Sequence, residues 1–500
     1  MLAFEFPARL QSPPSGPGDA IHMRPRHVIR LVGLFLILFS LTMLPPAVIA
    51  LHTADGQLDT FLNSFLLLAA AGALLWYPSR KSRGNLHNRE TFLVVALFWL
   101  LLGTLGSLPL LLGTQLSVTD AVFEAVSGFT ATGASTITGI DALPASILIY
   151  RQQLQWYGGL GIVVLAVAIL PMLGVGGMQL YRAEMAGPLK DERITPRVVQ
   201  TARFMLLIYI GLTIACASAY WLAGMSAFDA LAHSFSTVST GGFSTHDASL
   251  GWFDNPTIEM IAIVFMLIGA ISFNTHFLAA YRLGPSAYWR DTQTRVFLTI
   301  VAVLIAVTMI LLMIDGRDSG AARTAAFQVV SVITTTGFVT EDFTAWPLGL
   351  PLILVFASFI GGCAGSTSGG LKVIRIIVLF KVGLREMRRL VHPQLVQPIR
   401  LGNRAVGPGV PDAIWGFFSV YVLTFAVFMI AVMATGIDHV TAFGAVATSI
   451  NNFGPGLGEA ALTFRDINDT AKWLCAFAML LGRLEIFTLL VLLTPGFWRK

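Results

Sequence analysis

Long apolar runs alternate with short polar connections along most of the 500 residues. About ten of these runs reach roughly 18 residues or more, enough for a helix to cross a bilayer core of about 30 Å. The pattern predicts an all-α integral membrane protein. We expect spans at residues 28–50, 58–77, 92–113, 148–172, 204–224, 258–281, 297–314, 348–384 with a break, 414–434 and 473–494.

The outer connections after the first pair of spans contain a second, shorter apolar segment that runs into Thr, Ser, Asn and Gly. These segments read DAVFEAVSGFTATGAS from Asp120, FDALAHSFSTVSTGGFS from Phe228, RTAAFQVVSVITTTGFVT from Arg323 and VTAFGAVATSINNFGPG from Val440. A helix of about ten residues is about 15 Å long, which is half the thickness of the hydrocarbon layer. We therefore expect each segment to enter from outside, stop midway and return as extended chain.

Extended backbone at mid-membrane depth is tolerated where it is buried in protein or lines a water-filled cavity. Four such segments, each between two crossings, predict an internal repeat of helix, half-helix, polar return and helix. Aligning the repeats on their glycines pairs Gly133, Gly241, Gly337 and Gly454. The predicted units are a cytoplasmic tail at 1–27, an extra helix pair at 28–80, and pore repeats around one axis at 90–190, 200–290, 295–390 and 411–500.

Composition and charge support a membrane topology. The chain is 55% hydrophobic and 12% charged, which is typical of neither soluble nor disordered proteins. Basic residues gather before residue 30, near residues 80–89, 182–203, 282–295 and 372–404, and at the C-terminus. Because basic loops stay on the cytoplasmic side, both termini are predicted to be cytoplasmic. The net charge of +5 therefore reflects topology and does not indicate nucleic-acid binding. The three cysteines lack the spacing of a disulfide framework or metal site.

The polar returns have the composition of a cation filter. Backbone carbonyls that point inward replace the water of a potassium ion, and glycine adopts the required backbone angles readily. An ordinary Thr-Gly turn explains any single stretch, but four together favour a filter. We expect the filter to comprise Thr130, Ala131, Thr132 and Gly133; Val238, Ser239, Thr240 and Gly241; Thr334, Thr335, Thr336 and Gly337; and Asn451, Asn452, Phe453 and Gly454.

A glycine-rich stretch, FIGGCAGSTSGGLKVIR at residues 359–375, interrupts the second helix of the third repeat. Glycine costs about 1 kcal/mol per residue in a helix, so this segment is predicted to unwind. It lacks the Gly-Lys-Ser/Thr ending of a nucleotide phosphate loop, because Leu371 precedes Lys372 and Val373 follows. Close packing between helices is the simpler alternative. Arg483 lies in the last apolar run, where a charge usually faces a cavity or a partner.

These motifs resemble the membrane subunits of the Trk/Ktr/HKT superfamily of potassium transporters, most closely the TrkH type, over nearly the whole chain from about Arg30. FTATGAS, STVSTGGFS, TTTGF and NNFGPGLG stand where that family has its filter loops, and QWYGGLGIVVLAVAILPMLGVGGMQLYRAE from Gln155 is similar to a family stretch after the first loop. The resemblance implies that the four glycines mark the filter. The residues then expected to coordinate K⁺ are Thr132, Gly133, Thr240, Gly241, Thr336, Gly337, Phe453 and Gly454.

The resemblance implies potassium as the transported ion, because plant relatives with a sodium preference carry serine where Gly133 stands. It further implies that the glycine-rich stretch obstructs the pore below the filter and moves on gating. The expected gate is Gly361, Gly362, Gly365, Ser366, Thr367, Ser368, Gly369, Gly370, Lys372 and Arg483. Asn451, Asn452 and Phe453 depart from the Thr-Gly pattern, so the ring is expected to be asymmetric.

The implied assembly is a homodimer in the bacterial inner membrane, in contact with lipid. The resemblance also implies that a cytosolic nucleotide-binding ring of the TrkA type controls its opening and that no nucleotide binds this chain. The alternative function is a sodium- or proton-coupled symporter, which usually shows buried mid-membrane carboxylates and inverted repeats. Here the repeats are parallel and the acids lie near helix ends, except Glu124 and Glu485. A membrane enzyme would need a convergent catalytic cluster, which the sequence does not show, so we predict that the chain is not an enzyme.

Overall fold

The computed structural model describes residues 25–82, 88–168, 194–317, 320–347, 349–402, 404–407 and 409–498. Most of the predicted tail at 1–27, the last residues of the predicted span at 148–172 and the end of the predicted repeat at 90–190 lie outside these ranges. The N-terminal pair consists of α1 (Pro25–Ser40), η1 (Leu41–Met43), α2 (Leu44–Thr53) and α3 (Leu58–Ser79). Gly33 of α1 and Gly72 of α3 face each other so closely that a Cβ on either would lie 2.8 Å from the other's carbonyl oxygen.

The next helices are grouped here by the bounds of the predicted repeats. The first group contains α4 (Asn88–Leu105), α5 (Leu108–Gly113), α6 (Val118–Phe129), η2 (Ile140–Ala142) and α7 (Ala145–Ala168). The second contains α9 (Ile194–Leu222), α10 (Ala227–Val238), η4 (Ser249–Phe253), α11 (Pro256–Ala270), α12 (Phe273–Leu278), the π-helical turn η5 (Ala279–Leu283) and α13 (Ser286–Arg290).

The remaining elements complete the chain. The third group contains α14 (Thr292–Ile314), α15 (Ala321–Ile333), η6 (Phe343–Ala345), α16 (Leu350–Ile360) and α17 (Val373–Val391), followed by an antiparallel pair of short strands, β1 (Arg400–Leu401) and β2 (Arg404–Ala405). The fourth contains α18 (Gly409–Met433), α19 (His439–Asn451), η7 (Gly458–Ala460), α20 (Asp469–Arg483), α21 (Phe487–Leu493) and α22 (Pro495–Trp498).

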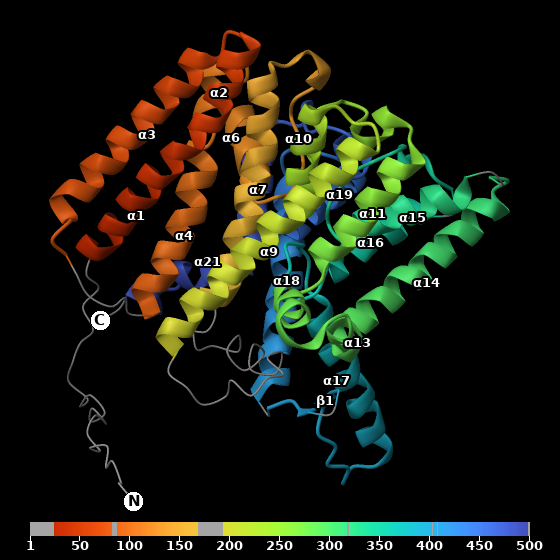
Figure 1. The fold of residues 1–500 in the computed structure, drawn as a ribbon. Helices are drawn as coiled ribbons and strands as arrows, with labels where there is room; N and C mark the ends of the chain where they lie inside the picture. Colours follow the sequence, from red (N-terminus) through yellow and green to blue (C-terminus); the bar gives the residue numbers. More distant parts are fainter. Residues whose placement is uncertain are drawn as a thin grey trace, which may run out of the picture.

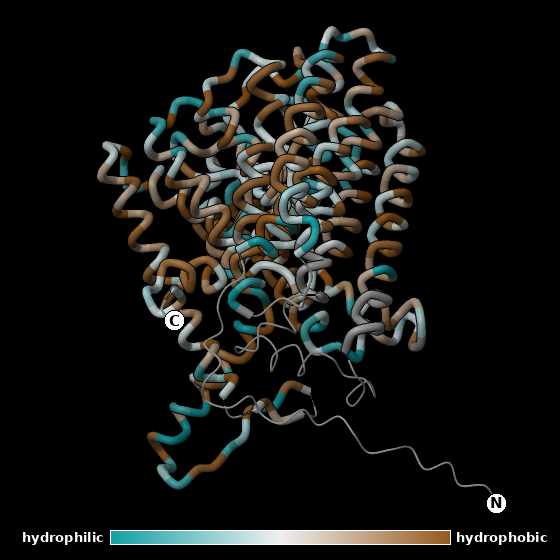
Figure 2. Tube along the Cα trace, turned by 90° about the vertical axis from the view of Figure 1, so that its left-hand side faces the viewer, coloured by the Kyte–Doolittle hydropathy of each residue, from teal (hydrophilic) through white to brown (hydrophobic). Residues whose placement is uncertain are grey.

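Figure 1 shows these helices as one bundle, with α1 and α3 at one edge and the end of α17 projecting together with β1. Hydrophobic residues colour most of the helices in Figure 2, and hydrophilic residues gather at the loops of the upper end and in the projecting part. Within the described residues, six helices are long and apolar enough to cross a membrane, or up to eight if each of two bent pairs counts as one span. The prediction of an all-α, multi-pass membrane protein is confirmed.

Three helices are broken within the bundle, and the sequence predicted one of these breaks. The break in the span at 348–384 is confirmed, since α16 ends at Ile360 and α17 begins at Val373. The spans at 258–281 and 473–494 were predicted to be continuous, and both predictions are wrong. α11 and α12 meet at a bend of 94°, and α20 and α21 meet at a bend of 115°.

Candidate functional site: a ring of four loops

The short helices α6, α10, α15 and α19 lie in the interior, and nearly all their residues after the first turn are buried. Their outer ends are fixed by side-chain caps at three of the four positions. The hydroxyl of Ser117 accepts from the Asp120 amide at 3.1 Å, that of Ser226 accepts from the Asp229 amide at 3.0 Å, and the Asp438 carboxylate caps α19. The inner ends lead directly into the predicted filter stretches.

All four helices end with the same pair of backbone hydrogen bonds. In α6, the amide of Ala131 donates to Gly128 at 2.9 Å and that of Thr132 donates to Ser127 at 2.8 Å. The equivalent bonds close α10, α15 and α19 at Thr240 and Gly241, Thr335 and Thr336, and Asn452 and Phe453. This is the Schellman motif, in which the residue after the helix adopts a left-handed conformation. Those residues are Ala131 (φ 53°), Thr240 (φ 53°), Thr335 (φ 56°) and Asn452 (φ 53°).

Two residues beyond each left-handed position stands a glycine with positive φ. These glycines are Gly133 (φ 85°), Gly242 (φ 83°), Gly337 (φ 85°) and Gly454 (φ 94°). In the second loop the equivalent residue is therefore Gly242, and the alignment of Gly241 with the other three glycines was one residue off. The sequence STGG contains two glycines. Because α10 ends at Val238, the left-handed residue is Thr240, and the glycine two residues later is Gly242. Val238 is the last helical residue and lies outside the loop.

We define the first, second, third and fourth loops as residues 130–133, 239–242, 334–337 and 451–454. Each positive-φ glycine lies against the carbonyl of the residue before the glycine in the next loop. A Cβ on Gly133 would overlap the Gly241 oxygen, one on Gly242 the Thr336 oxygen and one on Gly337 the Phe453 oxygen. A Cβ on Gly454 would lie 3.0 Å from the Thr132 oxygen, which returns to the first loop. The loops thus form a closed ring.

The ring is not symmetric in its side chains. In the first and third loops, the hydroxyls of Thr130 and Thr132 and of Thr334 and Thr336 are hydrogen-bonded at 2.7 Å. In the second loop, Gly241 stands where those loops have their second threonine, and the side chain of Gln155 from α7 fills the space. In the fourth loop, the Asn452 amide donates to the Thr132 hydroxyl at 2.9 Å and to the Met479 carbonyl at 3.0 Å. The asymmetry was expected in the fourth loop, and the structure shows it in the second loop as well.

A second group of predicted residues, the Gly-rich segment at 361–372, lies against the inner ends of the short helices. The hydroxyl of Thr367 donates to the last carbonyl of α10, at Val238, over 3.1 Å. The amide of Gly369 donates to the Thr335 hydroxyl at 2.7 Å, and that of Gly370 donates to the last carbonyl of α19, at Asn451, over 3.2 Å. The segment therefore contacts three of the four helix ends.

The Gly-rich segment also explains the unpredicted break after α11. The amides of Cys363 and Thr367 donate to the carbonyls of Ala270 and Gly269 at 2.8 and 3.2 Å, and the Phe273 amide donates to Gly365 at 2.9 Å. These bonds satisfy backbone groups that α11 and α12 lose where the helix breaks. Such a break is tolerated in a membrane protein because other protein groups pair with the freed backbone.

The break after α20 has a similar cause. Arg483 ends α20, and its guanidinium donates to the Thr367 carbonyl at 2.8 Å and to the Gly158 carbonyl at 3.3 Å. Glu485 (φ 55°) forms an ion pair of 2.5 Å with Arg375 of α17. Arg483 and Glu485 therefore bind different partners. Gly482 precedes the break, residues 484–486 include no glycine or proline, and the contacts with the Gly-rich segment and α17 stabilise the bent conformation.

Other predicted gate residues complete the packing of the Gly-rich segment. A Cβ on Gly361 would overlap the Gly369 oxygen, and the Gly362 carbonyl accepts from the Val373 amide at 3.0 Å. The ammonium of Lys372 donates to the Ser368 carbonyl. A cavity of about 50 Å³ separates this segment from the break after α20, and its lining includes Gly365, Ser366, Ser368, Gly370, Lys372, Asn452 and Arg483. The structure thus brings the whole predicted gate together beneath the ring.

Two residues that support the ring, Gln155 and Gly158, were not predicted from the sequence. Gln155 contacts the backbone of the second loop, and its position about two turns into the predicted span at 148–172 gave no signal of this role. Gly158 lies against the end of α6, where a Cβ would overlap the Phe129 carbonyl oxygen. The paired glycines in QWYGGLG were a signal of close helix packing that could have identified Gly158.

Comparison with known proteins gives one consistent result. The profile of a family described as TrkH, cation transport protein, matches residues 57–499. The Trk system potassium uptake protein TrkH of Vibrio parahaemolyticus is 54% identical over 486 residues, which cover 96% of this chain and 100% of that protein. The Escherichia coli K12 protein of the same name is 53% identical over 480 residues, covering 95% and 99%. The Trk system potassium uptake protein TrkG of that strain is 40% identical over 479 residues, covering 95% and 99%.

The fold agrees with these sequence matches. The crystal structure of the potassium transporter TrkH from Vibrio parahaemolyticus matches with a TM-score of 0.89 and 52% identity, covering 95% of this chain and 100% of that one.

Proposed function

Because the chain belongs to the TrkH family of cation transport proteins, we propose that it takes up potassium across the bacterial inner membrane through a pore whose selectivity filter is the ring of four loops. The printed names of the relatives support potassium as the ion. The family consists of membrane ion transporters, so the prediction that the chain is not an enzyme is confirmed.

The closed ring carries this proposal. Four equivalent glycines with left-handed backbone stand next to four equivalent carbonyls, at Thr132, Gly241, Thr336 and Phe453. Carbonyl oxygens replace the hydration shell of an alkali cation without a full negative charge, and the negative ends of the four helix dipoles add to their attraction. We place the K⁺ ligands among Thr132, Gly133, Gly241, Gly242, Thr336, Gly337, Phe453 and Gly454. Compared with the sequence prediction, Gly242 replaces Thr240.

For this pore we propose the architecture predicted from the sequence, with four repeats and an additional helix pair. Residues 90–190, 200–290, 295–390 and 411–500 form the four repeats, and residues 28–80 form an additional pair. The common helix ending at Ala131, Thr240, Thr335 and Asn452, followed in each case two residues later by a glycine with positive φ, supports the repeat.

We place the gate in the Gly-rich segment and Arg483. This segment hydrogen-bonds to the inner ends of α10 and α19, and Arg483 holds it through the Thr367 carbonyl. Opening then requires Thr367, Gly369 and Gly370 to leave the helix ends together. The buried positive charge of Arg483 adds an electrostatic barrier to cations in the closed state.

The assembly follows from the family resemblance. The chain forms a homodimer with both termini in the cytoplasm, and a TrkA-type ring binds the regulatory nucleotide. The words "Trk system" in the names of the relatives support a multicomponent assembly. The projecting end of α17 carries Arg385, Arg388 and Arg389, which gives it the charge to bind an acidic partner or anionic lipid headgroups (Figure 1).

Coupled transport is the less favoured function. The acids that such a mechanism would use, Glu124 and Glu485, are each bound by an arginine, at 2.7 Å from Arg151 and 2.5 Å from Arg375. A carboxylate held in such a pair is not free to exchange a sodium ion or a proton.

The test of the filter compares two glycines with the same backbone geometry. Gly242 (φ 83°) lies against the Thr336 carbonyl, whereas Gly139 (φ 73°) has no described heavy atom within 4 Å of its Cβ position. In a bacterium that lacks its own potassium uptake, we expect Gly242→Ala to reduce potassium uptake at least about tenfold, equivalent to about 1.4 kcal/mol. Gly139→Ala should transport normally. Normal uptake by Gly242→Ala, at equal amounts in the membrane, would refute the filter.

A further inference from the structure

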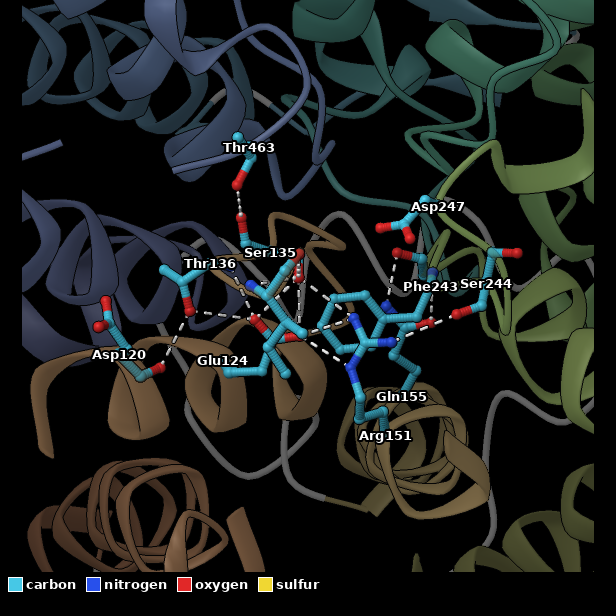
Figure 3. A network of polar contacts seen from close by, with 12 residues as sticks. Asp120, Glu124, Ser135, Thr136, Arg151, Gln155, Phe243, Ser244, Asp247 and Thr463 are labelled. Carbon is cyan, nitrogen blue, oxygen red and sulfur yellow. Dashed lines mark hydrogen bonds and ion pairs between the residues drawn. The ribbon is translucent and has the colours of Figure 1, made fainter. Parts of the chain in front are cut away.

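We propose that a polar clamp of Glu124, Arg151 and Gln155 sets the separation of the first and second loops and thereby the preference for potassium over sodium. This inference rests on the proposed function. These residues are positioning residues, because they hold the backbone of the ring and do not face an ion. Figure 3 shows them between α6, α7 and the second loop.

Gln155 holds the second loop on both sides of Gly242. Its Nε2 donates to the Gly241 carbonyl at 2.7 Å, and its Oε1 accepts from the Phe243 amide at 3.0 Å. One buried side-chain amide thus satisfies a donor and an acceptor of the loop, which fixes both the position and the direction of that stretch of backbone. Because Gln155 belongs to α7, it ties the second loop to the helix that follows the first loop.

Arg151 lies one helical turn before Gln155, on the same face of α7. Its Nε and Nη2 donate to Glu124 Oε1 at 2.9 and 2.7 Å, and its Nη1 donates to the Ser244 carbonyl at 3.3 Å. The guanidinium also lies 4.3 Å from the centre of the Phe243 ring. Arg151 therefore connects the short helix of the first loop with the outer return of the second.

Glu124 completes the connection through its second oxygen. Glu124 Oε2 accepts from the Thr136 amide at 2.9 Å, and the Ser135 hydroxyl donates to Oε1 at 3.0 Å. The Ser135 carbonyl in turn accepts from the Thr463 hydroxyl at 3.2 Å, so the return of the first loop is also held from the fourth repeat (Figure 3).

In two other repeats, the residue that corresponds to Glu124 also hydrogen-bonds to the chain that follows the loop. His233 of α10 and Gln328 of α15 occupy the position of Glu124, seven residues before the left-handed residue that follows each helix. The His233 ring is hydrogen-bonded with the Ser244 hydroxyl at 2.9 Å, and Gln328 Nε2 donates to the Glu341 carbonyl at 3.0 Å. Ala445 stands at this position in α19. Glu124 is the charged member of the set, and its charge requires Arg151, which reaches across to the second loop.

Burial makes this connection strong and rigid. The side chains of Arg151 and Glu124 are 1% and 0% exposed. Removing one partner would leave an uncompensated buried charge, whereas removing both charges together avoids that penalty. Selection between cations depends on how the coordinating oxygens are held, so a looser first and second loop would accept the smaller sodium ion more readily.

The test is a charge-balanced double variant, Glu124→Gln with Arg151→Gln. The matched control is Glu259→Gln with Arg323→Gln, which removes another ion pair, of 2.6 Å, between α11 and α15 away from the ring. We expect the clamp variant to lower the ratio of potassium to sodium uptake at least about fivefold, the effect of losing one typical hydrogen bond. The maximal rate of uptake should remain, because the pore is still present. The control should keep the ratio of the unmodified protein.

Gln155→Met is a second variant that changes no charge and tests the clamp if the double variant fails to fold. It removes the donor to Gly241 and should lower the same ratio. A ratio within about twofold of the unmodified protein in whichever of these variants fold would refute the clamp. If Gly242→Ala abolishes uptake while the clamp variants keep the ratio, the filter stands and the clamp is wrong. Normal transport by Gly242→Ala would refute the filter itself.

Discussion

Single residues in the ring adopt backbone conformations that their side chains do not favour. Ala131, Thr240 and Thr335 are left-handed at a helix end where glycine is the usual residue, and Asn452 is the type that tolerates this conformation. A left-handed conformation costs an ordinary residue roughly 1–2 kcal/mol. The surrounding hydrogen bonds must therefore hold these residues in place.

This strain predicts the effect of removing a side chain. Ala131→Gly should raise the stability of the purified protein by about 1 kcal/mol, because glycine adopts φ 53° without strain. The control is Ala125→Gly in the middle of α6, which should lower stability by about 1 kcal/mol, since glycine is unfavourable within a helix. Thermal unfolding in detergent measures both. A loss of stability in Ala131→Gly would contradict the assignment of strain to this position.

At the scale of the element, the close approach of α7 to α6 depends on one glycine. A Cβ on Gly158 of α7 would overlap the carbonyl oxygen of Phe129 at the end of α6. A Cβ on Gly161 would have ordinary van der Waals contact, because its nearest atom, in Trp99, would be 3.5 Å away. Both glycines lie in α7, so alanine should gain the same helix propensity at each position. A difference between the two alanine variants therefore reports the effect of packing.

Gly158→Ala should therefore reduce the amount of folded protein in the membrane strongly, because α7 cannot move away from α6 without displacing the first loop. Gly161→Ala should be neutral or stabilising by up to about 1 kcal/mol, the helix propensity gained. Size-exclusion profiles of the two detergent-solubilised variants make the comparison. Equal profiles would show that α7 has room to move.

The elements were largely predictable, and their breaks were not. Hydrophobic length located the spans, and the four polar returns located the short helices, because both signals are local. The glycines at 361–370 predicted the break between α16 and α17. The breaks after Ala270 and Arg483 arise from contacts with a segment about a hundred residues away, which no local pattern encodes. The choice of Gly242 over Gly241 likewise depended on the end of α10, which sequence places only to within a few residues.

In the molecule as a whole, the Gly-rich segment is the point where three broken helices meet. Thr367 alone contributes bonds to α10, to α11 and, through its carbonyl, to Arg483 of α20. Displacing this segment would therefore disturb the inner ends of several repeats at once. If this segment is the gate, as we propose, this arrangement gives a physical basis for all-or-none opening.

For the proposed gate, Thr367→Val should weaken the closed state, because valine keeps the shape and removes the hydroxyl, whose one proton is shared between the carbonyls of Val238 at 3.1 Å and Gly269 at 3.0 Å. We expect potassium flux without the regulatory partner to rise several-fold, since a lost hydrogen bond is worth about 1 kcal/mol. The control is Thr308→Val in α14, where the buried hydroxyl has no hydrogen-bond partner among the described residues. Flux into proteoliposomes that equals the control would argue against this role of the hydroxyl.

The place of Gln155 behind Gly241 has a consequence for any redesign of the proposed pore. Grafting the sequence TATG of the first loop onto STGG of the second would introduce a threonine side chain into the volume that the glutamine already fills. The four quarters are therefore not interchangeable modules, and an engineered pore built from four copies of one quarter would also need a new α7.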